Sequence, residues 1–281
     1  MEKLIAKAGA RGRIFVVKYG GSFMDSPDPA VREGVARDVV ALQAAGILPV
    51  VVHGGGKAIT RAMEEAGVKA NFVQGMRVTD EKTSAVVERV LSNEINPEIV
   101  ATMKKLGGKA QGFSGTEIFR CEKLWLRDSA GEKVDVGYVG DVTGVDATQL
   151  RDTLAGGLIP VISPTARGGD GKIYNCNADV AAAQAAIALG AHRLVFLSDV
   201  PGLLRDPQDP KTLISHLAES EVIELKRAGI IDRGMIPKVD SAVAARRAGV
   251  KEVLFLDGRV SHALLRDIFA DEETGGTKIV S

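Results

Sequence analysis

The stretch from Tyr174 to Asp179 places two asparagines and an aspartate directly before an alanine-rich run that ends at Gly190. Asn177 is well placed to cap the helix that this run predicts, and Asp179 then lies in the first turn, where the helix dipole favours an anion. Asn175 and Asn177 have the same parity, so an extended strand running into the cap projects both to one side. The pattern predicts either a well-capped buried helix or the floor of an active site.

Two lysines occupy positions from which a side chain can reach a ligand. Lys18 ends a short apolar run and precedes two glycines, so it can project into the crevice where α/β sheets bind ligands, or turn outward to solvent. Lys238 follows a glycine turn and a proline that begin a predicted helix, and it is either a ligand-binding lysine or a solvated one. Arg77 lies in an extended segment and can clamp a carboxylate through two hydrogen bonds, although the pattern also fits a surface arginine.

Glycine-rich turns follow the first two apolar runs. Gly20 and Gly21 come after the first run, and Gly54, Gly55 and Gly56 come after the second. Such turns bring backbone N–H groups close to an anion, usually a phosphate or a carboxylate. Neither turn contains the G-x-G-x-x-G fingerprint, which argues against a nicotinamide dehydrogenase.

Several other chemistries do not fit the sequence. The run that ends at Gly56-Lys57 is not a P-loop, because Val51 occupies its first glycine position and Ala58 replaces the required serine or threonine. No G-x-S-x-G elbow supplies a serine nucleophile. The histidines have neither the i, i+4 spacing nor the cysteine partners of a zinc site; they are His53, His192, His216 and His262. No metal site is therefore predicted within the protein itself.

The elements that must position these groups alternate along the chain. Strand, glycine loop and helix occur twice before residue 67, with strands at 14–17 and 47–52 and helices at 29–45 and 57–66. Parallel strands joined by helices predict a doubly wound α/β sheet. The other expected strands are 158–162, 194–197, 253–256 and an edge strand at 278–280, and the other expected helices are 147–155, 180–190, 217–228, 238–248 and 261–269.

The middle of the chain is less regular. Residues 71–80 are expected to be extended, and Thr79 or Asp80 then caps a long helix that Pro97 interrupts. Residues 109–145 contain short β-like runs separated by turn signals. These runs predict hairpins over one end of the main sheet, where they would form a lid on the substrate.

The amino-acid composition limits the classes of protein to which this chain can belong. Of the 281 residues, 45% are hydrophobic and 26% are charged, as in an ordinary globular protein. Lys plus Arg and Asp plus Glu both number 36, so no net field favours nucleic acid or an anionic membrane. No apolar run approaches the ~18 residues of a membrane span, and residues 1–13 lack the apolar core of a secretory signal. Two cysteines, Cys121 and Cys176, make no disulfide framework and indicate the cytoplasm.

Taken together, these motifs resemble the amino acid kinase superfamily and, within it, the N-acetylglutamate kinase family. The resemblance runs from Lys18 to about Val280, and the ordered set of motifs is specific although no single member is. The motifs are Lys18-Tyr19-Gly20-Gly21, His53-Gly54-Gly55-Gly56, Gly75-Met76-Arg77-Val78-Thr79-Asp80, Gly137-Tyr138-Val139-Gly140, Asn175-Cys176-Asn177-Ala178-Asp179, Ser198-Asp199-Val200-Pro201-Gly202, Gly234-Met235-Ile236-Pro237-Lys238-Val239 and Asp257-Gly258-Arg259.

The resemblance implies both a fold and a reaction. The fold is a three-layer αβα sandwich around a mainly parallel open sheet, like that of carbamate kinase. It would form one domain over residues 1–281, with an acceptor-substrate lobe at about 1–170 and a nucleotide lobe at about 171–281. The reaction is phosphoryl transfer from ATP, with Mg²⁺ carried by the nucleotide, to the side-chain carboxylate of N-acetyl-L-glutamate in arginine biosynthesis.

The resemblance also implies roles for individual residues. The lysine matching Lys18 stabilises the transferring phosphoryl group, the lysine matching Lys238 acts from the ATP side, and the aspartate matching Asp179 orients both. The implied substrate-binding residues are Gly20, Gly21, Gly54, Gly55, Arg77, Asn175 and Asn177. The implied nucleotide-binding residues are Asp199, Val200, Pro201, Gly202, Leu203, Leu204, Ile231 and Asp232.

The implied reaction agrees with the residue types. A carboxylate acceptor has a free pKa near ~4.3 and is ionised at neutral pH, so no general base is required. The obstacle is to bring two anions together and to stabilise charge on the transferring group. Positioned lysines, glycine N–H groups and Mg²⁺ meet that obstacle.

Three residues depart from the usual pattern of the family and leave other acceptors open. Lys57 stands where proline is common, Arg233 where a second glycine is frequent, and Phe23 where a small residue is expected. One alternative is a sister kinase that acts on another carboxylate, such as a carrier-linked aminoadipate. The other alternative is a non-catalytic nucleotide sensor on the same fold.

The resemblance leaves regulation open. Arginine-inhibited members of the family carry an N-terminal helix that links dimers into a hexamer, but only 17 residues precede Lys18 here. His262 and the acidic run Asp271-Glu272-Glu273 could form an arginine pocket or simply a solvated terminus. A homodimer is expected at least, with a hexamer and feedback inhibition by L-arginine as further possibilities.

Overall fold

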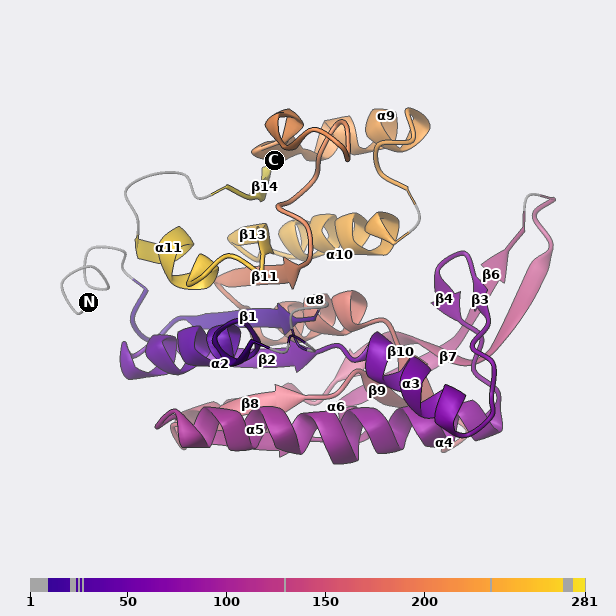
Figure 1. Ribbon diagram of the computed structural model, residues 1–281, viewed down its shortest axis with the longest axis horizontal. Coiled ribbons are helices and arrows are strands. Elements are labelled where there is room, and N and C mark those ends of the chain that lie inside the picture. Colours follow the sequence, from indigo (N-terminus) through magenta and orange to yellow (C-terminus); the bar gives the residue numbers. More distant parts are fainter. Residues whose placement is uncertain are drawn as a thin grey trace.

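An eight-stranded sheet runs through the computed structural model, which describes residues 10–20, 24, 26, 28–128, 130–232, 234–269 and 275–280 (Figure 1). The strand order is β12-β14-β13-β11-β1-β2-β8-β5. All neighbouring pairs are parallel except β13 and β14, which confirms the mainly parallel α/β sheet. The strands are β1 (Ile14–Tyr19), β2 (Leu48–His53), β5 (Ala110–Phe113), β8 (Ile159–Ile162), β11 (Arg193–Ser198), β12 (His216–Ala218), β13 (Glu252–Asp257) and β14 (Thr277–Val280).

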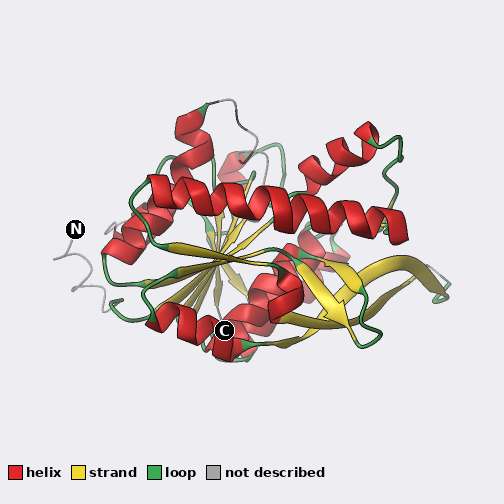
Figure 2. Ribbon diagram, turned by 90° about the horizontal axis from the view of Figure 1, so that it is seen from below, coloured by secondary structure: helices red, strands yellow, loops and turns green. Residues whose placement is uncertain are grey.

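Helices cover both faces of this sheet, as Figure 2 shows. Alternation within β1 divides its side chains between two cores, with Val16 on one face and Phe15 and Val17 on the other. Lys18 has the parity of Val16, so the strand directs it to the face that carries α8. The helices on that face are α7 (Ala147–Ala155), α8 (Ala178–Leu189) and α10 (Met235–Arg247), and those on the opposite face are α2 (Pro29–Ala44), α5 (Asn96–Lys105) and α11 (Ala263–Phe269).

The long helix expected after Asp80 consists of three successive segments: α4 (Glu81–Glu88), the π-helical η2 (Arg89–Ile95) and α5. The Asp80 side chain accepts a hydrogen bond from the Thr83 N–H and caps α4, as predicted. Pro97 does not end the helix. The chain widens before it into a π turn, in which the Asn96 N–H bonds to the Leu91 carbonyl, and then continues as α5. The wider turn accommodates a residue that cannot donate an α-helical hydrogen bond.

The prediction of hairpins at 109–145 was right for one pair of strands, but their expected place as a lid over one end of the main sheet was wrong. β5, the first strand of that segment, pairs with β8 and forms the outer strand of the main sheet. The next two strands form one long hairpin that extends away from the body of the molecule (Figure 1). Periodicity could not reveal this because it identifies a strand without identifying its neighbour. The hairpin consists of β6 (Phe119–Arg127) and β7 (Lys133–Val145), which close a small barrel with β9 (Thr165–Gly168) and β10 (Ile173–Cys176).

A short hairpin lies over the edge of the site instead. It consists of β3 (Phe72–Val73) and β4 (Met76–Arg77). Its turn is attached to the long hairpin because Gln74 Nε2 donates a hydrogen bond to the Arg127 carbonyl at 2.6 Å. The β3–β4 hairpin, and not the segment at 109–145, therefore covers this edge of the site.

The sequence prediction also misplaced elements near the C-terminus. The helix expected at 217–228 begins as β12, passes through a 3₁₀ turn and becomes α9 (Val222–Arg227). Because β12 takes the outer position beside β14, the latter is not the expected edge strand. The remaining elements are α3 (Gly56–Glu65), which was predicted, α6 (Gly115–Ile118), η3 (Pro210–Thr212) and η4 (Glu219–Glu221).

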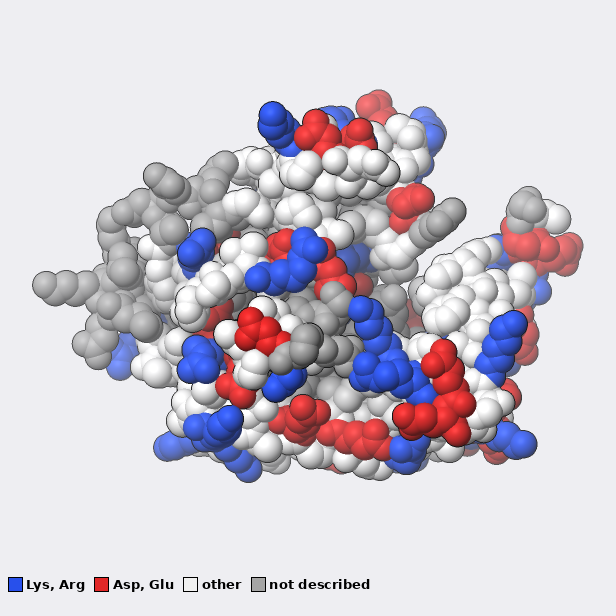
Figure 3. Space-filling view, in the orientation of Figure 1, with Lys and Arg blue, Asp and Glu red and all other residues white. Residues whose placement is uncertain are grey.

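The face of the molecule in Figure 3 shows no dominant sign of charge. Lysine, arginine, aspartate and glutamate side chains are interspersed over the face in Figure 3. Within the described ranges, none of the helices combines the length and the apolar character that a membrane crossing requires. Cys121 and Cys176 are both buried and carry free thiols.

Candidate active site

Two lysines from distant parts of the chain meet one aspartate. Lys18 at the carboxyl end of β1 and Lys238 near the start of α10 place their Nζ atoms 3.2 Å and 3.0 Å from Asp179 Oδ1. The three side chains are nearly buried, with exposed fractions of 12%, 8% and 11% for Lys18, Lys238 and Asp179. The Lys238 Nζ also lies 5.3 Å from the centroid of the Phe196 ring. The structure thus brings together the three residues predicted to be catalytic, and we call them the lysine–aspartate cluster.

Asp179 stays ionised although it is buried. Burial alone raises the pKa of a carboxyl, but the charges and hydrogen bonds of Lys18 and Lys238 outweigh it and lower the pKa of Asp179 to about 2. Burial and the nearby Lys18 lower the pKa of Lys238, whereas Asp179 opposes that shift. Two cations and one anion leave the cluster with a net positive charge, so an additional anion beside it is favourable.

The helix that carries Asp179 begins at the predicted cap. Asn177 Oδ1 accepts hydrogen bonds from the N–H groups of Asp179 and Val180, at 2.8 Å and 3.4 Å. The Asn177 amide nitrogen has no hydrogen-bond partner in the part of the chain that the structure describes, so it is left to donate to a ligand. Asn175 Nδ2 lies 3.5 Å from Thr79 Oγ1, which is a long hydrogen bond that a ligand can replace.

The two glycine turns contact each other beside this cluster. The Gly54 N–H donates a hydrogen bond to the Tyr19 carbonyl at 2.7 Å, and a Cβ on Gly54 would lie 3.5 Å from Gly20 Cα. A Cβ on Gly20 would approach Lys18 Nζ to 2.7 Å, so glycine is needed there for the lysine to reach its position. Gly21, which was predicted to bind substrate, lies outside the described residues.

A cavity of about 280 Å³ opens between the glycine turns and the β3–β4 hairpin, and we call it the acceptor cavity. Lys18 and Asp179 are among the residues that line it. The predicted site residues that line it are Lys18, Gly20, Gly54, Gly55, Arg77, Asn175, Asn177 and Asp179. A sequence-derived set of residues from three strands, two glycine turns and the start of α8 is therefore gathered around one space.

Arg77 is buried in the wall of the acceptor cavity, with an exposed fraction of 7%. Its Nη2 atom donates hydrogen bonds to the Gly56 carbonyl at 2.9 Å and to Thr60 Oγ1 at 2.7 Å, so β4 is joined to α3. Among the described residues, no carboxylate pairs with Arg77. A largely buried guanidinium with neutral acceptors only is well suited to bind a carboxylate ligand.

Apolar side chains complete the lining of the acceptor cavity, and sequence reasoning missed them. Phe72 is 52% exposed, and the Arg77 guanidinium carbon lies 4.7 Å from the centroid of its ring. Such surfaces accommodate the hydrocarbon part of a small ligand. A lone aromatic residue three positions before Gly75 and close to Arg77 was the signal that could have identified Phe72. The apolar residues that line the cavity include Ile59, Phe72, Met76 and Leu91, together with Val139, Pro164 and Ala178.

The predicted nucleotide segment begins where β11 ends, beyond the lysine–aspartate cluster. Val200 is 38% exposed, whereas Leu203 and Ile231 are each 1% exposed and pack in the core on the α8 face. The Leu203 N–H donates a hydrogen bond to Thr277 Oγ1 at 2.8 Å, which attaches the segment to β14. Leu203 and Ile231 therefore anchor the segment through their side chains.

The other residues of that segment occupy different environments. A Cβ on Gly202 would lie 2.5 Å from a Thr277 side-chain oxygen, so only glycine fits against β14. Leu204 forms an isolated bridge with Leu213. Asp232 is exposed, and Asp199 and Pro201 are half-buried. Asp199, Pro201 and Asp232 can therefore face a ligand.

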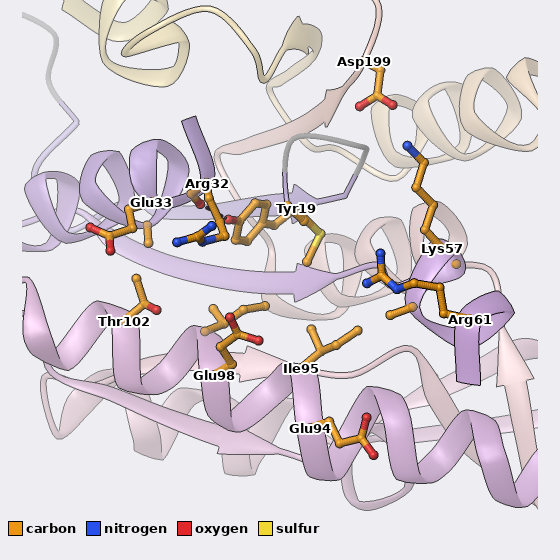
Figure 4. Close-up of a pocket in the computed structure, with 16 residues that line it drawn as sticks. Tyr19, Arg32, Glu33, Lys57, Arg61, Glu94, Ile95, Glu98, Thr102 and Asp199 are labelled. Carbon is orange, nitrogen blue, oxygen red and sulfur yellow. Dashed lines mark hydrogen bonds between the residues drawn. The ribbon is translucent and has the colours of Figure 1, made fainter. Parts of the chain in front are cut away.

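A larger cavity of about 610 Å³ lies between α2, α3 and α5, and sequence reasoning did not predict it (Figure 4). It shares Gly55 and Gly56 with the acceptor cavity, and Asp199 also lines it. In Figure 4, Lys57 extends from α3 toward Asp199. Lys57 therefore adds a positive charge between the glycine turn and the predicted nucleotide segment. The lining comes from elements far apart in sequence, which is why no local pattern indicated this cavity.

The described residues do not offer a metal site of their own. Within those ranges, no group of three or more histidine, cysteine, aspartate or glutamate side chains could hold a metal ion. A metal ion at this site would therefore draw at least part of its ligands from a bound substrate.

Comparisons with known proteins identify the family of this chain. Residues 13–257 match the model of the amino acid kinase family. Acetylglutamate kinase of Akkermansia muciniphila is 44% identical over 271 residues, which cover 96% of this chain and 90% of the relative. Acetylglutamate kinase of Methanocaldococcus jannaschii is 44% identical over 270 residues, covering 94% of this chain and 89% of the relative.

Solved structures share the fold. N-acetylglutamate synthase from Neisseria gonorrhoeae, solved with coenzyme A and N-acetyl-glutamate, has a TM-score of 0.83 and 25% identity; the match covers 99% of this chain and 62% of the synthase. Carbamate kinase of Giardia has a TM-score of 0.67 and 16% identity, and the match covers 96% of this chain and 99% of the carbamate kinase chain. This match supports the fold alone. The chain belongs to the acetylglutamate kinase branch of the amino acid kinase family, as the sequence matches show.

Proposed function

We propose that the lysine–aspartate cluster is where this chain transfers a phosphoryl group. As an acetylglutamate kinase, the chain phosphorylates the side-chain carboxylate of N-acetyl-L-glutamate with ATP, in arginine biosynthesis. One observation carries the assignment of the site: the Nζ atoms of Lys18 and Lys238 lie within 3.2 Å of the same oxygen of Asp179, which lines the acceptor cavity.

The reaction is a direct displacement at phosphorus. An oxygen of the acceptor carboxylate forms a bond to the γ-phosphorus, the bond from that phosphorus to the β,γ-bridging oxygen breaks, and ADP leaves. The acceptor is ionised at neutral pH, so no proton needs to be removed and no general base is required. Catalysis therefore depends on orientation and on stabilisation of negative charge.

Each member of the lysine–aspartate cluster has a separate part in that stabilisation. Lys18 lies on the acceptor side and stabilises the transferring phosphoryl oxygens, and Lys238 lies on the nucleotide side and stabilises the leaving group. Asp179 holds both ammonium groups in place before substrate arrives, so little reorganisation is needed during the reaction. The glycine turn adds N–H donors, because α3 begins at Gly55 without a side-chain cap.

The acceptor cavity offers complementary groups for N-acetyl-L-glutamate. The Arg77 guanidinium binds the α-carboxylate, and the free Asn177 amide nitrogen and Asn175 bind the acetylated amide. The apolar wall formed by Phe72 and Met76 contacts the acetyl methyl group. Gly54 and Gly55 approach the side-chain carboxylate through their backbone. These assignments are consistent with a volume of about 280 Å³, which suits a small molecule.

The nucleotide is assigned to the other side of the lysine–aspartate cluster. Its polyphosphate and ribose would lie along residues 199–204 and 231–232, from Asp199 to Asp232. Mg²⁺ would be held mainly by phosphate oxygens and water, because the described residues contain no group of three or more histidine, cysteine, aspartate or glutamate side chains that could hold it without the nucleotide. We propose a division into an acceptor lobe at about 1–170 and a nucleotide lobe at about 171–281, with Asn175 and Asn177 reaching the acceptor cavity from the start of the second lobe.

The acceptor is tested by coupled ADP-release assays with N-acetylglutamate, free glutamate and aminoadipate. We expect turnover with N-acetylglutamate and its abolition by EDTA. Turnover with aminoadipate or glutamate alone would contradict the assignment in favour of a sister carboxylate kinase. ATP binding without turnover of any acceptor would support the nucleotide-sensor alternative.

The oligomeric state and the regulation of the chain are proposed separately from its reaction. The chain is proposed to form at least a homodimer in the cytoplasm, where its free thiols stay reduced. N-acetylglutamate synthase from Neisseria gonorrhoeae has been solved with L-arginine. His262 Nδ1 lies 2.7 Å from Asp38 Oδ1, and residues 271–273 lie outside the described residues. Assays with millimolar arginine and light scattering test regulation; unchanged activity with a dimeric mass would reject a regulated hexamer.

A further inference from the structure

A buried histidine lies directly beneath the glycine turn that borders both cavities. His53 ends β2 and has an exposed fraction of 0%. It shares the parity of Val51, so it faces the α5 side of the sheet, opposite to the lysine–aspartate cluster. On that side it meets Asn96, which is 3% exposed and begins α5 immediately after the π-helical turn. None of the roles assigned above involves this pair.

The hydrogen bonds of Asn96 determine which nitrogen of His53 carries the proton. Asn96 Nδ2 lies 2.9 Å from the Val161 carbonyl oxygen and 3.4 Å from the Phe113 carbonyl oxygen, and both of these can only accept. The same nitrogen lies 3.3 Å from His53 Nε2, so Nε2 must be the acceptor. The proton is therefore on His53 Nδ1, which donates to the Gly54 carbonyl at 2.8 Å.

At neutral pH, His53 is uncharged and carries its single ring proton on Nδ1. A second proton on Nε2 would face the amide donor of Asn96, and burial lowers the pKa of His53 to about 4, although the hydrogen bond to Gly54 opposes that shift. His53 is therefore unsuited to exchange protons with a substrate at neutral pH. Its contribution must come from the hydrogen bond that it donates.

That hydrogen bond fixes the orientation of one peptide. Gly54 is held at both backbone groups, because its N–H donates to the Tyr19 carbonyl at 2.7 Å and its carbonyl accepts from His53 at 2.8 Å. In a trans peptide, the following N–H points away from the carbonyl. The Gly54 carbonyl turns toward the buried α5 side, so the Gly55 N–H points toward the acceptor cavity that both glycines line. A glycine peptide would otherwise rotate easily.

We propose that His53 and Asn96 are positioning residues for phosphoryl transfer, which fix the Gly54–Gly55 peptide so that the Gly55 N–H donates to the transferring phosphoryl group. The proposal rests on the function proposed above. Asn96 holds the His53 tautomer, His53 holds the Gly54 carbonyl, and the Gly55 N–H meets the charge that develops during transfer. Neither side chain touches a substrate.

Two substitutions test the hydrogen bond from His53 to Gly54 separately from the loss of the imidazole ring. In His53→Asn, the amide nitrogen can take the place of Nδ1 and donate to the Gly54 carbonyl. In His53→Gln, the longer side chain carries its amide toward Nε2, so the donor to Gly54 is lost while a polar group still faces Asn96. His192→Gln is the matched control, because His192 precedes β11 at the opposite end of the sheet.

The measurement is steady-state kinetics with ATP and N-acetylglutamate, together with a thermal unfolding curve for each variant. We expect His53→Gln to lower kcat about 10²-fold, the effect of losing one oriented donor. Both KM values should stay within about threefold of the wild type, because the interaction forms in the transition state. His53→Asn should recover most of kcat, and His192→Gln should match the wild type. Equal losses in His53→Asn and His53→Gln, or a change confined to KM, would overturn the proposal.

A spectroscopic test is independent of turnover and of any substitution. ¹⁵N NMR of the histidine side chains in the wild-type protein should show His53 protonated at Nδ1 at pH 7. Protonation at Nε2 would overturn the proposal even if the variants could not be purified. If the wild type fails to phosphorylate N-acetylglutamate, the proposed function is contradicted, whereas the spectrum still reports whether His53 donates to Gly54.

Discussion

Lys18 and Lys238 lie 220 positions apart in the chain, yet both ammonium groups contact one oxygen, Oδ1 of Asp179. Like charges repel, so this proximity depends on the shared anion and on the two elements that carry the lysines. β1 fixes Lys18 through its parity, and α10 fixes Lys238 against the ring of Phe196. The arrangement resembles a site built to receive an additional anion.

The protonation of Lys238 sets a limit on activity at alkaline pH. Its pKa lies below the ordinary value of 10.5, because of burial and the nearby Lys18. The charged form is needed to stabilise the leaving group, so kcat should decline as pH rises, and the decline should begin below pH 10.5. A pH profile from 6 to 10.5 with a coupling system verified at each pH measures this. A rate that stays flat up to the ordinary lysine pKa would contradict the role of Lys238.

The two functions of Asn177 can be separated by substitution. Asn177→Ala removes the cap of α8 and should destabilise the protein by about 1 kcal/mol, as measured by urea unfolding. Asn177→Asp keeps an acceptor for the helix N–H groups but replaces the amide donor with an anion. It should retain the wild-type stability while kcat/KM for N-acetylglutamate falls at least tenfold, or about 1.4 kcal/mol. Wild-type kinetics in Asn177→Asp would show that the residue is a cap only.

Arg77 is expected to set acceptor affinity. Arg77→Lys keeps the charge but loses the bidentate geometry, so KM for N-acetylglutamate should rise about 10- to 100-fold while KM for ATP changes little. Arg37→Lys is the control, since Arg37 lies on α2 and its side chain is 52% exposed. An equal rise in KM for ATP would mean that the substitution disturbs the site as a whole. No rise in either value would remove Arg77 from the acceptor cavity's function.

His53 makes a prediction about stability against pH. Its pKa falls from 6.5 in the unfolded chain to about 4 in the folded protein, so the unfolded chain binds a proton that the folded protein does not. Stability should therefore fall as pH decreases from about 6.5 to about 4, by about 3 kcal/mol at most. His53→Asn should flatten that part of the profile relative to the wild type. Parallel profiles for the two proteins would show that His53 titrates normally.

The sequence predicted the parts of the fold that depend on local pattern. β1, β2, β8, β11 and β13 have continuous apolar runs, and the caps Asn177 and Asp80 are determined by their own side chains. Strand neighbours could not be predicted in the same way. β5 joins the main sheet and β12 takes its edge, because pairing depends on which edge remains open once other strands have assembled.

The candidate site likewise contains residues that local motifs reveal and residues that only tertiary contacts reveal. Residues in motifs, such as Lys18 and Asn175, were found because their types and positions are unusual. Phe72, Met76 and Leu91 were missed, because an apolar residue in a wall looks like any core residue until its neighbours are known. The role of Asn96 was missed for the same reason, since it depends on a π turn that no propensity indicates.

The most direct test of the whole account is turnover by Asp179→Asn. The substitution keeps the size of the side chain and removes the anion that holds Lys18 and Lys238. We predict a folded protein whose kcat for N-acetylglutamate phosphorylation, measured as ADP release at saturating substrates, is at least about 10²-fold below the wild type. A near-normal kcat in a protein with native circular dichroism would contradict the account, because the two lysines would then need no shared anion.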